Sequence, residues 1–354
     1  MLHTHINSKE KLLIHLFLHR ITFLKFNEKN ILAKRIQNLD DLNNLSLLQM
    51  QTLLNRELKL KEKWNPSENL RMAEIALNYC QKLDIQILLN QDLEYPELLR
   101  QIADPPYLLF CRGDINILAD RSVSVVGTRR ITPEGKNAAR EFAYSAVLDS
   151  CNVISGLANG ADGFAHQGAI DAYFDYCEKG LDTMKLGKTI AVMPTSIDVI
   201  TPASHKKLAS QIIQSGGLLI SEYEPGLPLA KWHFVGRNRI IAGLSPATLV
   251  VEAPAGSGAL ITADFALENG RDVFFHQVAF NQIAQEIDRL SKNELDKAFE
   301  QKKVSKFKKE NTIEKYLEAG APVIKDYKDY CQVLKEIPGK RAVEINQGEL
   351  FKLD

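Results

Sequence analysis

The chain has 354 residues, of which 45% are hydrophobic and 25% are charged, a composition typical of a folded globular protein with one large domain and a smaller appendage. Its 44 basic and 44 acidic residues give a formal net charge of +0, which excludes strong attraction of a polyanion by the protein as a whole. The 5 cysteines are widely spaced, no secretory signal opens the chain and no apolar run approaches about 18 residues, so we expect a cytoplasmic protein without disulfides or a zinc site.

Residues 1–64 are predicted to form a small all-α N-terminal domain. Leu12, Leu13 and Leu16 recur at helical spacing, and few β-branched residues interrupt the segment. A polar stretch follows and contains Asn65 and Pro66, a pair that favours a boundary between structural units.

Residues 67–335 are predicted to form an α/β domain. A helix over 67–83 leads to strands at 85–89 and 107–110, and from Arg121 onward strands and helices alternate. The strands expected there are continuous apolar runs, which is typical of a sheet that helices cover on both faces. The fold class is therefore a Rossmann-like, doubly wound, mostly parallel sheet, whose right-handed crossovers bring the strand-end loops to one rim. These strands are expected at 122–126, 152–155, 189–193, 217–221, 247–252, 272–275 and 322–324.

Residues 277–310 depart from this alternation. The segment is helix-prone and rich in lysine, with Lys302, Lys303 and Lys306 accompanied by acidic residues such as Glu294. A solvated helical hairpin and an additional basic contact surface both fit this composition. The last residues, 336–354, are predicted to form a short polar tail.

Three glycine-bearing loops follow apolar strands and precede predicted helices. In a parallel sheet such loops share one edge, where backbone N–H groups and helix N-termini can hold phosphate. Tight turns, a helix cap at Asp162 and close packing of strand against helix are the structural alternatives. The candidate phosphate-binding residues in the loops are Gly127, Thr128, Arg129, Gly156, Gly160, Gly256, Ser257 and Gly258.

A fourth segment, residues 228–245, interleaves cations with large aromatic side chains before a helix. Aromatic rings beside guanidinium groups can stack unpaired bases and bind the backbone of a nucleic acid. The alternative is that the aromatics belong to the core and that the arginines are ordinary helix-start charges. Beside three anion-type loops, we interpret Phe234, Arg237 and Arg239 as binding residues.

Catalytic residues and cofactor motifs are not found in the sequence. It contains neither HExxH nor GxSxG, and no Gly-Lys-Ser/Thr of a P-loop. The acids Asp162, Glu222, Glu224 and Glu252 show no spacing typical of an acid–base pair. We therefore predict no catalytic residue, no metal and no cofactor.

Several motifs in one order resemble the DNA-processing protein A (DprA/Smf) family. The resemblance is close over about 85–275 and looser over 312–333. It rests on residues 95–99 (Tyr-Pro-Glu-Leu-Leu), 104–108 (Asp-Pro-Pro-Tyr-Leu), 126–129 (Val-Gly-Thr-Arg), 155–162 (Ser-Gly-Leu-Ala-Asn-Gly-Ala-Asp), 237–245 (Arg-Asn-Arg-Ile-Ile-Ala-Gly-Leu-Ser) and 252–262 (Glu-Ala-Pro-Ala-Gly-Ser-Gly-Ala-Leu-Ile-Thr).

The resemblance implies an extended Rossmann-like domain that binds single-stranded DNA and is not an enzyme. It also implies a homodimer that protects incoming DNA and helps to load the bacterial strand-exchange recombinase during natural transformation. The implied strand-binding pocket contains the loop residues named above together with the segment from Phe234 to Arg239. The chain departs from the family pattern at Thr128, where serine is common, and at His276 and Gln277, where the lysine-rich segment replaces a Pro-Gly turn.

Two other hypotheses fit the sequence. One is a nucleotide-binding enzyme of the related phosphoribohydrolase (lysine-decarboxylase-like) group, which usually carries a Pro-Gly-Gly-x-Gly-Thr loop where residues 255–259 read Ala-Gly-Ser-Gly-Ala. The other is a scaffold whose loops bind nothing.

Overall fold

A single nine-stranded sheet organises the computed structural model, which describes residues 8–36, 38–60 and 63–336. The strand order is β1-β2-β6-β5-β4-β3-β7-β8-β9, with β1 and β2 antiparallel to their neighbours and all other pairs parallel. This confirms the predicted mostly parallel sheet. The strands are β1 (Gln86–Leu89), β2 (Leu108–Gly113), β3 (Ser122–Val126), β4 (Asn152–Ser155), β5 (Thr189–Val192), β6 (Leu218–Ser221), β7 (Ala247–Val250), β8 (Asp272–His276) and β9 (Val323–Ile324).

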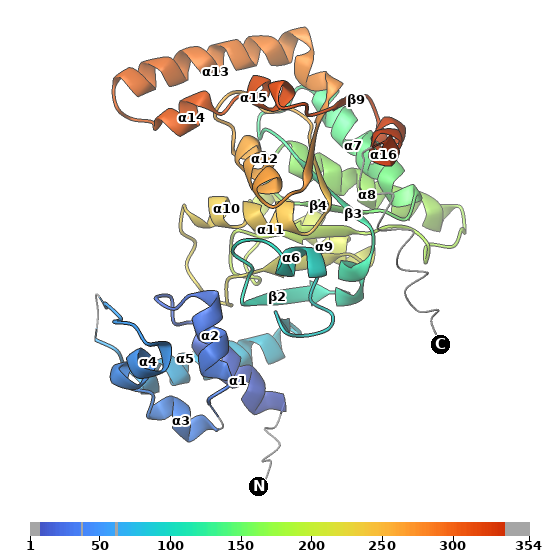
Figure 1. Ribbon diagram of the computed structural model, residues 1–354. Helices are drawn as coiled ribbons and strands as arrows, with labels where there is room; N and C mark the ends of the chain where they lie inside the picture. Colours follow the sequence, from blue (N-terminus) through green and yellow to red (C-terminus); the bar gives the residue numbers. More distant parts are fainter. Residues whose placement is uncertain (1–7, 37, 61–62, 337–354) are drawn as a thin grey trace, which may run out of the picture.

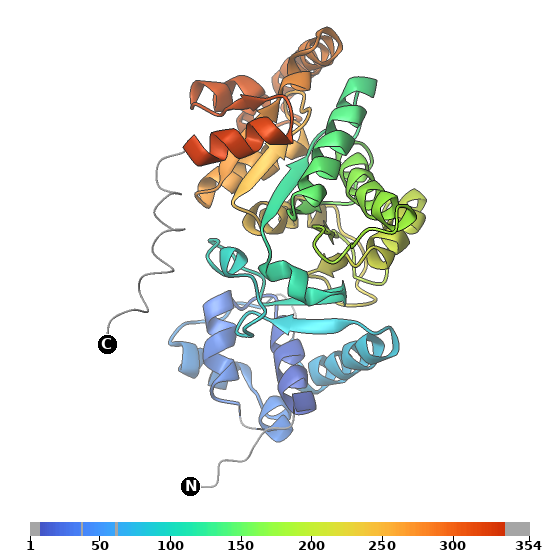
Figure 2. The ribbon, with the colours of Figure 1, turned by 90° about the vertical axis from the view of Figure 1, so that its right-hand side faces the viewer.

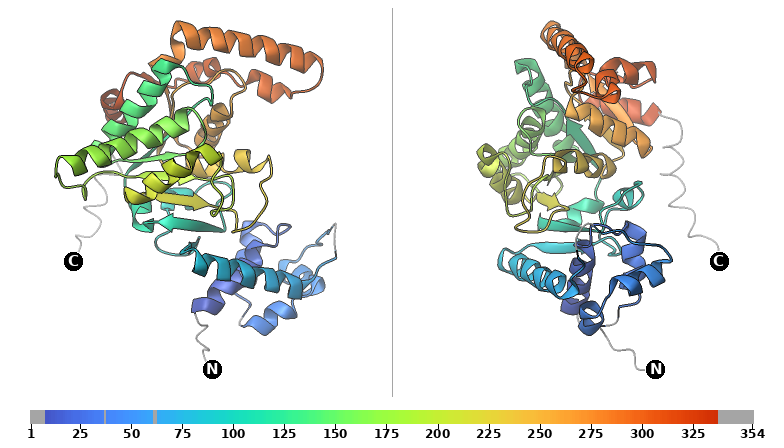
Figure 3. Two further views of the ribbon diagram at one scale, coloured as in Figure 1. Left: turned by 180° about the vertical axis from the view of Figure 1, so that it is seen from behind. Right: turned by 90° about the vertical axis from the view of Figure 1, so that its left-hand side faces the viewer.

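Helices cover both faces of the sheet, as the continuous apolar strands predict. One face carries α7 (Pro133–Leu148), α8 (Ala161–Glu178) and α9 (Lys206–Gln214), which Figure 3 shows from behind. The other face carries α6 (Glu97–Arg100), α11 (Asn238–Gly243) and α12 (Gly258–Glu268) (Figure 1). The remaining elements after β2 are η1 (Ile115–Ala119), η2 (Ala203–His205), α10 (His233–Gly236), η3 (Gln277–Phe280), α13 (Gln282–Glu300), α14 (Lys306–Glu310), α15 (Ile313–Glu318) and α16 (Tyr327–Glu336).

The central strand β3 shows how the sequence divides the two faces. Val123 and Val125 belong to the apolar cluster beneath α7 and α8. On the opposite face the hydroxyl of Ser124 donates to the carbonyl of Ile241 at 2.7 Å, and that of Ser122 to the carbonyl of Leu244 at 3.1 Å. The strand therefore fixes α11 by these hydrogen bonds as well as by apolar packing, since Val126 shares a buried cluster with Ile240 and Ile241.

The N-terminal helices are α1 (Ser8–His19), α2 (Phe26–Ala33), α3 (Leu39–Asn43), α4 (Leu47–Leu54) and α5 (Pro66–Lys82), in agreement with the predicted helical segment. Asn65 caps α5 and Pro66 occupies its first turn, an arrangement that favours helix initiation there. One apolar cluster joins these helices to the sheet and includes Phe17, Leu108 and Leu219. The domain boundary at residue 64 stays a prediction.

The elements at the two edges of the sheet lie far apart. Helices α1–α5 lie beside the β1 edge, and α13–α15 lie at the opposite end (Figures 1 and 2). The segment 277–310 is largely helical and contains η3, α13 and α14. Of the predicted tail, all but Glu336 lies outside the described residues. Across the described part of the chain, no helix combines the length and the apolar character needed to cross a membrane.

Burial lowers the pKa of several histidines, and three of them reach values of about 3 to 4. His166 is 0% exposed, and its Nδ1 lies 2.7 Å from the Thr189 hydroxyl. Burial lowers the pKa of His166 to about 3, and the nearby charges of His205 and Arg237 act in the same direction. Burial likewise lowers the pKa of His15 to about 4 and that of His19 to about 3.

The pH dependence of stability follows from these pKa values. A buried histidine with a lowered pKa binds fewer protons than it does in the unfolded chain, so its contribution is complete above pH 6.5 and is lost as the pH falls toward about 3. We expect His166→Gln to reduce the decline in free energy of unfolding between about pH 6.5 and 5, measured by urea unfolding at each pH. Comparison with the wild type cancels the carboxylate contributions. Identical pH profiles would contradict the assignment.

Candidate functional site

A pocket of about 460 Å³ opens at the carboxyl ends of β3 and β7. The chain leaves β3 toward β4 on one side, whereas β7 lies on the other side, so this is the topological switch point at which doubly wound sheets bind ligands. Eight of the eleven predicted site residues line the pocket: Gly127, Thr128, Arg129, Phe234, Arg237, Gly256, Ser257 and Gly258. The lining also contains Arg130, Asn238, Ile241 and Thr262, which the sequence analysis did not single out.

Close backbone approach explains the glycines of the first two loops. A Cβ on Gly127 would lie 2.6 Å from the Cβ of Ala161, and a Cβ on Gly160 would lie 2.2 Å from the carbonyl oxygen of Thr128. The loops are also hydrogen bonded, because Thr128 donates its N–H to the Glu252 carbonyl at 2.7 Å and accepts from the Ala161 N–H at 3.2 Å. Small residues thus let three turns pack against one another at one edge of the sheet.

Two predicted loop glycines do not line the pocket. Gly156 lies under Arg237, whose Nη1 would be 2.0 Å from a Cβ at that position, and Gly160 lies against the loop after β3. The structure gives both glycines a packing role, and phosphate binding by them stays a prediction. The expected helix cap at Asp162 is also wrong, because Gly160 occupies the N-cap of α8 and Asp162 lies in the first turn.

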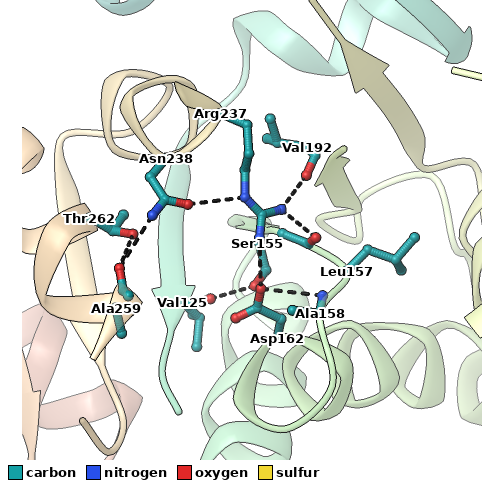
Figure 4. Close-up of polar contacts among 12 residues, drawn as sticks. Val125, Ser155, Leu157, Ala158, Asp162, Val192, Arg237, Asn238, Ala259 and Thr262 are labelled. Atoms are coloured by element: carbon teal, nitrogen blue, oxygen red, sulfur yellow. Dashed lines mark hydrogen bonds and ion pairs between the residues drawn. The ribbon is translucent and has the colours of Figure 1, made fainter. Parts of the chain in front are cut away.

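Arg237 connects four segments of the chain at the base of the pocket (Figure 4). Its Nη1 donates to the carbonyls of Gly156 and Val192, and its Nη2 lies 3.7 Å from the Asp162 carboxylate. The Nε donates to Oδ1 of Asn238 at 3.0 Å.

Asn238 extends the connection to α12, because its amide donates to the carbonyl of Gly258 at 3.2 Å. Arg237 is 5% exposed, so most of its donors are used inside the protein. Burial raises the pKa of Asp162 although Arg237 opposes the shift. Arg237 therefore holds the loops in position, and its predicted contact with phosphate stays a prediction.

Arg239 belongs to a different part of the molecule. Its guanidinium binds Glu222 through contacts of 2.9 and 2.7 Å and Asp104 through a contact of 3.0 Å. The side chain lines a separate pocket near α2, together with Lys25 and Lys29. Two carboxylates therefore neutralise Arg239 away from the switch point, and unlike most of the predicted site residues it does not line that pocket.

Arg129 and Phe234 form the exposed cationic part of the pocket. The guanidinium carbon of Arg129 lies 5.1 Å from the centroid of the Phe234 ring, a cation–π contact. Arg129 and Arg130 are exposed, Phe234 is half-buried, and neither arginine forms an ion pair with any described residue. These two guanidinium groups are available to an anionic ligand.

The loop after β7 offers fewer backbone donors than expected. Ala255 donates its N–H to the carboxylate of Asp288 on α13 at 2.7 Å, and Gly256 donates to the carbonyl of Asn311 at 2.9 Å. Gly256 has φ +69°, which accounts for glycine at this turn. Phosphate binding by the Gly256 N–H is therefore not available, and its role is to shape the turn.

The acidic residues of the rim have structural partners. Glu252 accepts hydrogen bonds from the N–H of Thr132 at 3.0 Å and from the Thr132 hydroxyl, which fixes the start of α7. Burial raises the pKa of Glu252. Among the residues the structure describes, no group of three metal-ligating side chains is placed to hold a metal ion.

The nine-stranded sheet and the pocket at its switch point define a Rossmann-like α/β protein. The model of the DNA recombination-mediator protein A family matches residues 86–310. The Smf protein of Borreliella burgdorferi is 31% identical over 265 residues, which cover 75% of this chain and 79% of that protein. The chain therefore belongs to the DNA recombination-mediator protein A family, the DprA/Smf family that its motifs resemble.

Other relatives agree with this assignment. The DNA processing protein DprA of Streptococcus pneumoniae is 41% identical over 180 residues, which cover 51% of this chain and 58% of that protein. An X-ray structure of DprA from the same species superposes with a TM-score of 0.61 at 26% identity, covering 90% of this chain and 97% of that one. This likeness confirms the extended Rossmann-like fold.

The contacts of Arg237 predict a loss of stability when it is removed. We expect Arg237→Ala to lower the free energy of unfolding by about 3–5 kcal/mol, because it leaves the Asp162 carboxylate buried without its partner. Arg129→Ala, which removes an exposed guanidinium, should change it by less than about 0.5 kcal/mol. Urea unfolding measures both. Equal stability of the two variants would contradict a positioning role for Arg237.

Proposed function

We propose that the protein binds single-stranded DNA at the switch-point pocket, with the strand's phosphates beside Arg129 and Arg130 and a base near Phe234. One observation carries the proposal: an exposed guanidinium without an acidic partner lies on an aromatic ring at the rim of a pocket of about 460 Å³. Guanidinium and aromatic groups together form the platforms on which unpaired bases stack. A duplex cannot enter such a pocket, whereas an unstacked nucleotide can.

The arrangement of charge supports local binding of a strand. The whole chain has a formal net charge of +0, so attraction must come from the few cations placed at the rim. Arg237 and Arg239 are occupied by protein partners, which leaves Arg129 and Arg130 as the cations of the pocket lining. Affinity should therefore depend on a small number of phosphate contacts.

Binding without catalysis fits the positions of the acids. A hydrolase of the phosphoribohydrolase type needs a carboxylate free to act on the sugar, but Glu252 binds Thr132 and Asp162 lies beneath Arg237. Glu222 is bound by Arg239. We propose that the protein acts by holding DNA rather than by changing it. Release of free base from nucleoside monophosphates by the purified protein would favour the enzyme instead.

Membership of the family supports a proposal for the biological role. As a recombination mediator, the protein would protect incoming single strands in the cytoplasm and help to load the strand-exchange recombinase during natural transformation. Action as a homodimer belongs to the same proposal. A pull-down of the recombinase by wild-type protein, with single-stranded DNA present and absent, tests the partner directly.

Removal of Arg129 should weaken DNA binding selectively. We expect Arg129→Ala to reduce affinity for a labelled oligothymidylate about tenfold, because one charge-assisted phosphate contact is lost. The slope of log affinity against log salt should become shallower by about 0.7. Fluorescence anisotropy at several salt concentrations measures both.

Arg140→Ala is the matched control, since Arg140 is an exposed arginine on α7 that pairs with Asp171 outside the pocket. It should leave affinity and slope near the wild-type values, and Arg129→Lys should recover part of the loss. If the wild-type protein fails to retain the oligonucleotide at low salt, or if the two alanine variants behave alike, the proposed site is wrong.

A further inference from the structure

A second cavity, of about 310 Å³, adjoins the switch-point pocket. Thr128, Arg130 and Pro254 line both cavities, so the loops after β3 and β7 form a shared wall between them. The far wall comes from α13, the helix of the lysine-rich segment, which runs above α12 and α15 in Figure 1. The function proposed above does not use this cavity.

The lining of the second cavity combines an apolar surface with balanced charge. Phe280, Ile287 and Ile313 supply apolar surface. The charged lining residues are three cations and three acids: Arg130, Arg289, Lys292, Glu252, Asp288 and Glu314. Because these charges cancel, the cavity suits a flat, neutral group with polar edges better than a phosphate.

Most of the charged side chains of α13 are already paired. Lys292 lies 2.7 Å from both Asp288 and Glu314, and Arg289 pairs with Glu286 one turn earlier. Arg130 is exposed and has no ion pair with a described residue, and it lies where the two cavities meet. A phosphate that joins two bound nucleotides would find its counter-charge there.

Direct contacts hold the far wall against the loop of the first pocket. The Asp288 carboxylate accepts the Ala255 N–H at 2.7 Å, and a Cβ on Gly256 would meet the Leu295 side chain at 3.0 Å. The carbonyl of Asn311, just after α14, accepts the Gly256 N–H at 2.9 Å. The lysine-rich segment is therefore more than a solvated hairpin. Its contacts with the loop after β7 hold α13 as the far wall of the second cavity.

We propose that the second cavity holds the base of the neighbouring nucleotide in the same DNA strand, with the phosphate between the two nucleotides beside Arg130. The proposal rests on the proposed function, since it extends the path of that strand. The two cavities share a wall, so one strand can pass from the first to the second. The apolar lining offers a surface for a base, and the guanidinium of Arg130 offers a contact for the phosphate between the two nucleotides.

Photocrosslinking locates the two bases in the wild-type protein. An oligothymidylate with 5-iododeoxyuridine at each position in turn is irradiated with the full chain, and the modified peptides are identified by mass spectrometry. We expect crosslinks both to the segment with Phe234 and to the segment with Phe280. Crosslinks to the Phe234 segment alone would overturn the second subsite and leave the proposed function intact. Absence of any bound oligonucleotide would overturn both.

Two variants on one helix provide the matched comparison. Ile287→Glu adds a negative charge inside the second cavity, whereas Leu290→Glu adds the same charge one turn further along, at a side chain that is 49% exposed and outside the lining. We expect Ile287→Glu to weaken oligonucleotide binding by about fivefold to hundredfold, the range for loss of one stacked base. Leu290→Glu should change it less than about twofold.

Circular dichroism and thermal unfolding establish that both variants fold. If Ile287→Glu does not fold, Ile287→Gln replaces it, because it places a polar amide in the second cavity and leaves the cations of the first pocket unchanged. Equal affinities for Ile287→Glu and Leu290→Glu would overturn the second subsite. Loss of binding in Arg129→Ala with normal binding in Ile287→Glu would confine the strand to the first pocket.

Discussion

The buried guanidinium of Arg237 holds the switch point together. It donates to the carbonyl of Gly156 after β4 and to that of Val192 in β5, and it lies beside the Asp162 carboxylate at the start of α8. Through Asn238 it also reaches the start of α12. A charge this deeply buried is stable only when its donors are satisfied, so the surrounding segments are held in one arrangement. The first and third glycine loops line a single pocket in that arrangement, and Gly156 of the second lies beneath the guanidinium.

This constraint separates two kinds of arginine at the site. Arg237 and Arg239 are buried and donate their hydrogen bonds to protein groups, whereas Arg129 and Arg130 are exposed at the rim. The first kind positions loops and the second kind is free to bind an anion. A protein with no net charge can bind a polyanion in this way, because rigid loops present a few unpaired cations beside an aromatic surface.

Local sequence patterns predicted the fold well. The short apolar runs predicted as strands form β3, β4 and β8. Asn65 and Pro66 stand at the start of α5. The loops after β3 and β7 were placed at one edge because parallel strands require it. Gly127 and Arg129 therefore line the pocket as expected.

The sequence does not show which side chains from distant positions in the chain pair with one another. Arg239 pairs with Glu222, 17 residues away, and with Asp104, 135 residues away, and no local pattern in the sequence shows either pairing. The same holds for Asp288, whose carboxylate accepts the Ala255 N–H, because the composition of its helix fitted either a solvated hairpin or a basic contact surface. Phe234 and Arg129 are 105 positions apart in number, yet the fold stacks them.

Hydrogen–deuterium exchange shows which backbone segments a bound strand covers. Amide exchange of the full chain is compared with and without a short single-stranded oligonucleotide. The account predicts slower exchange in the loop 127–131, in the segment 233–238 and in the start of α12, with no change in the peptides that surround Arg239's acidic partners. Protection around Asp104 and Glu222, with unchanged exchange at the switch point, would contradict it.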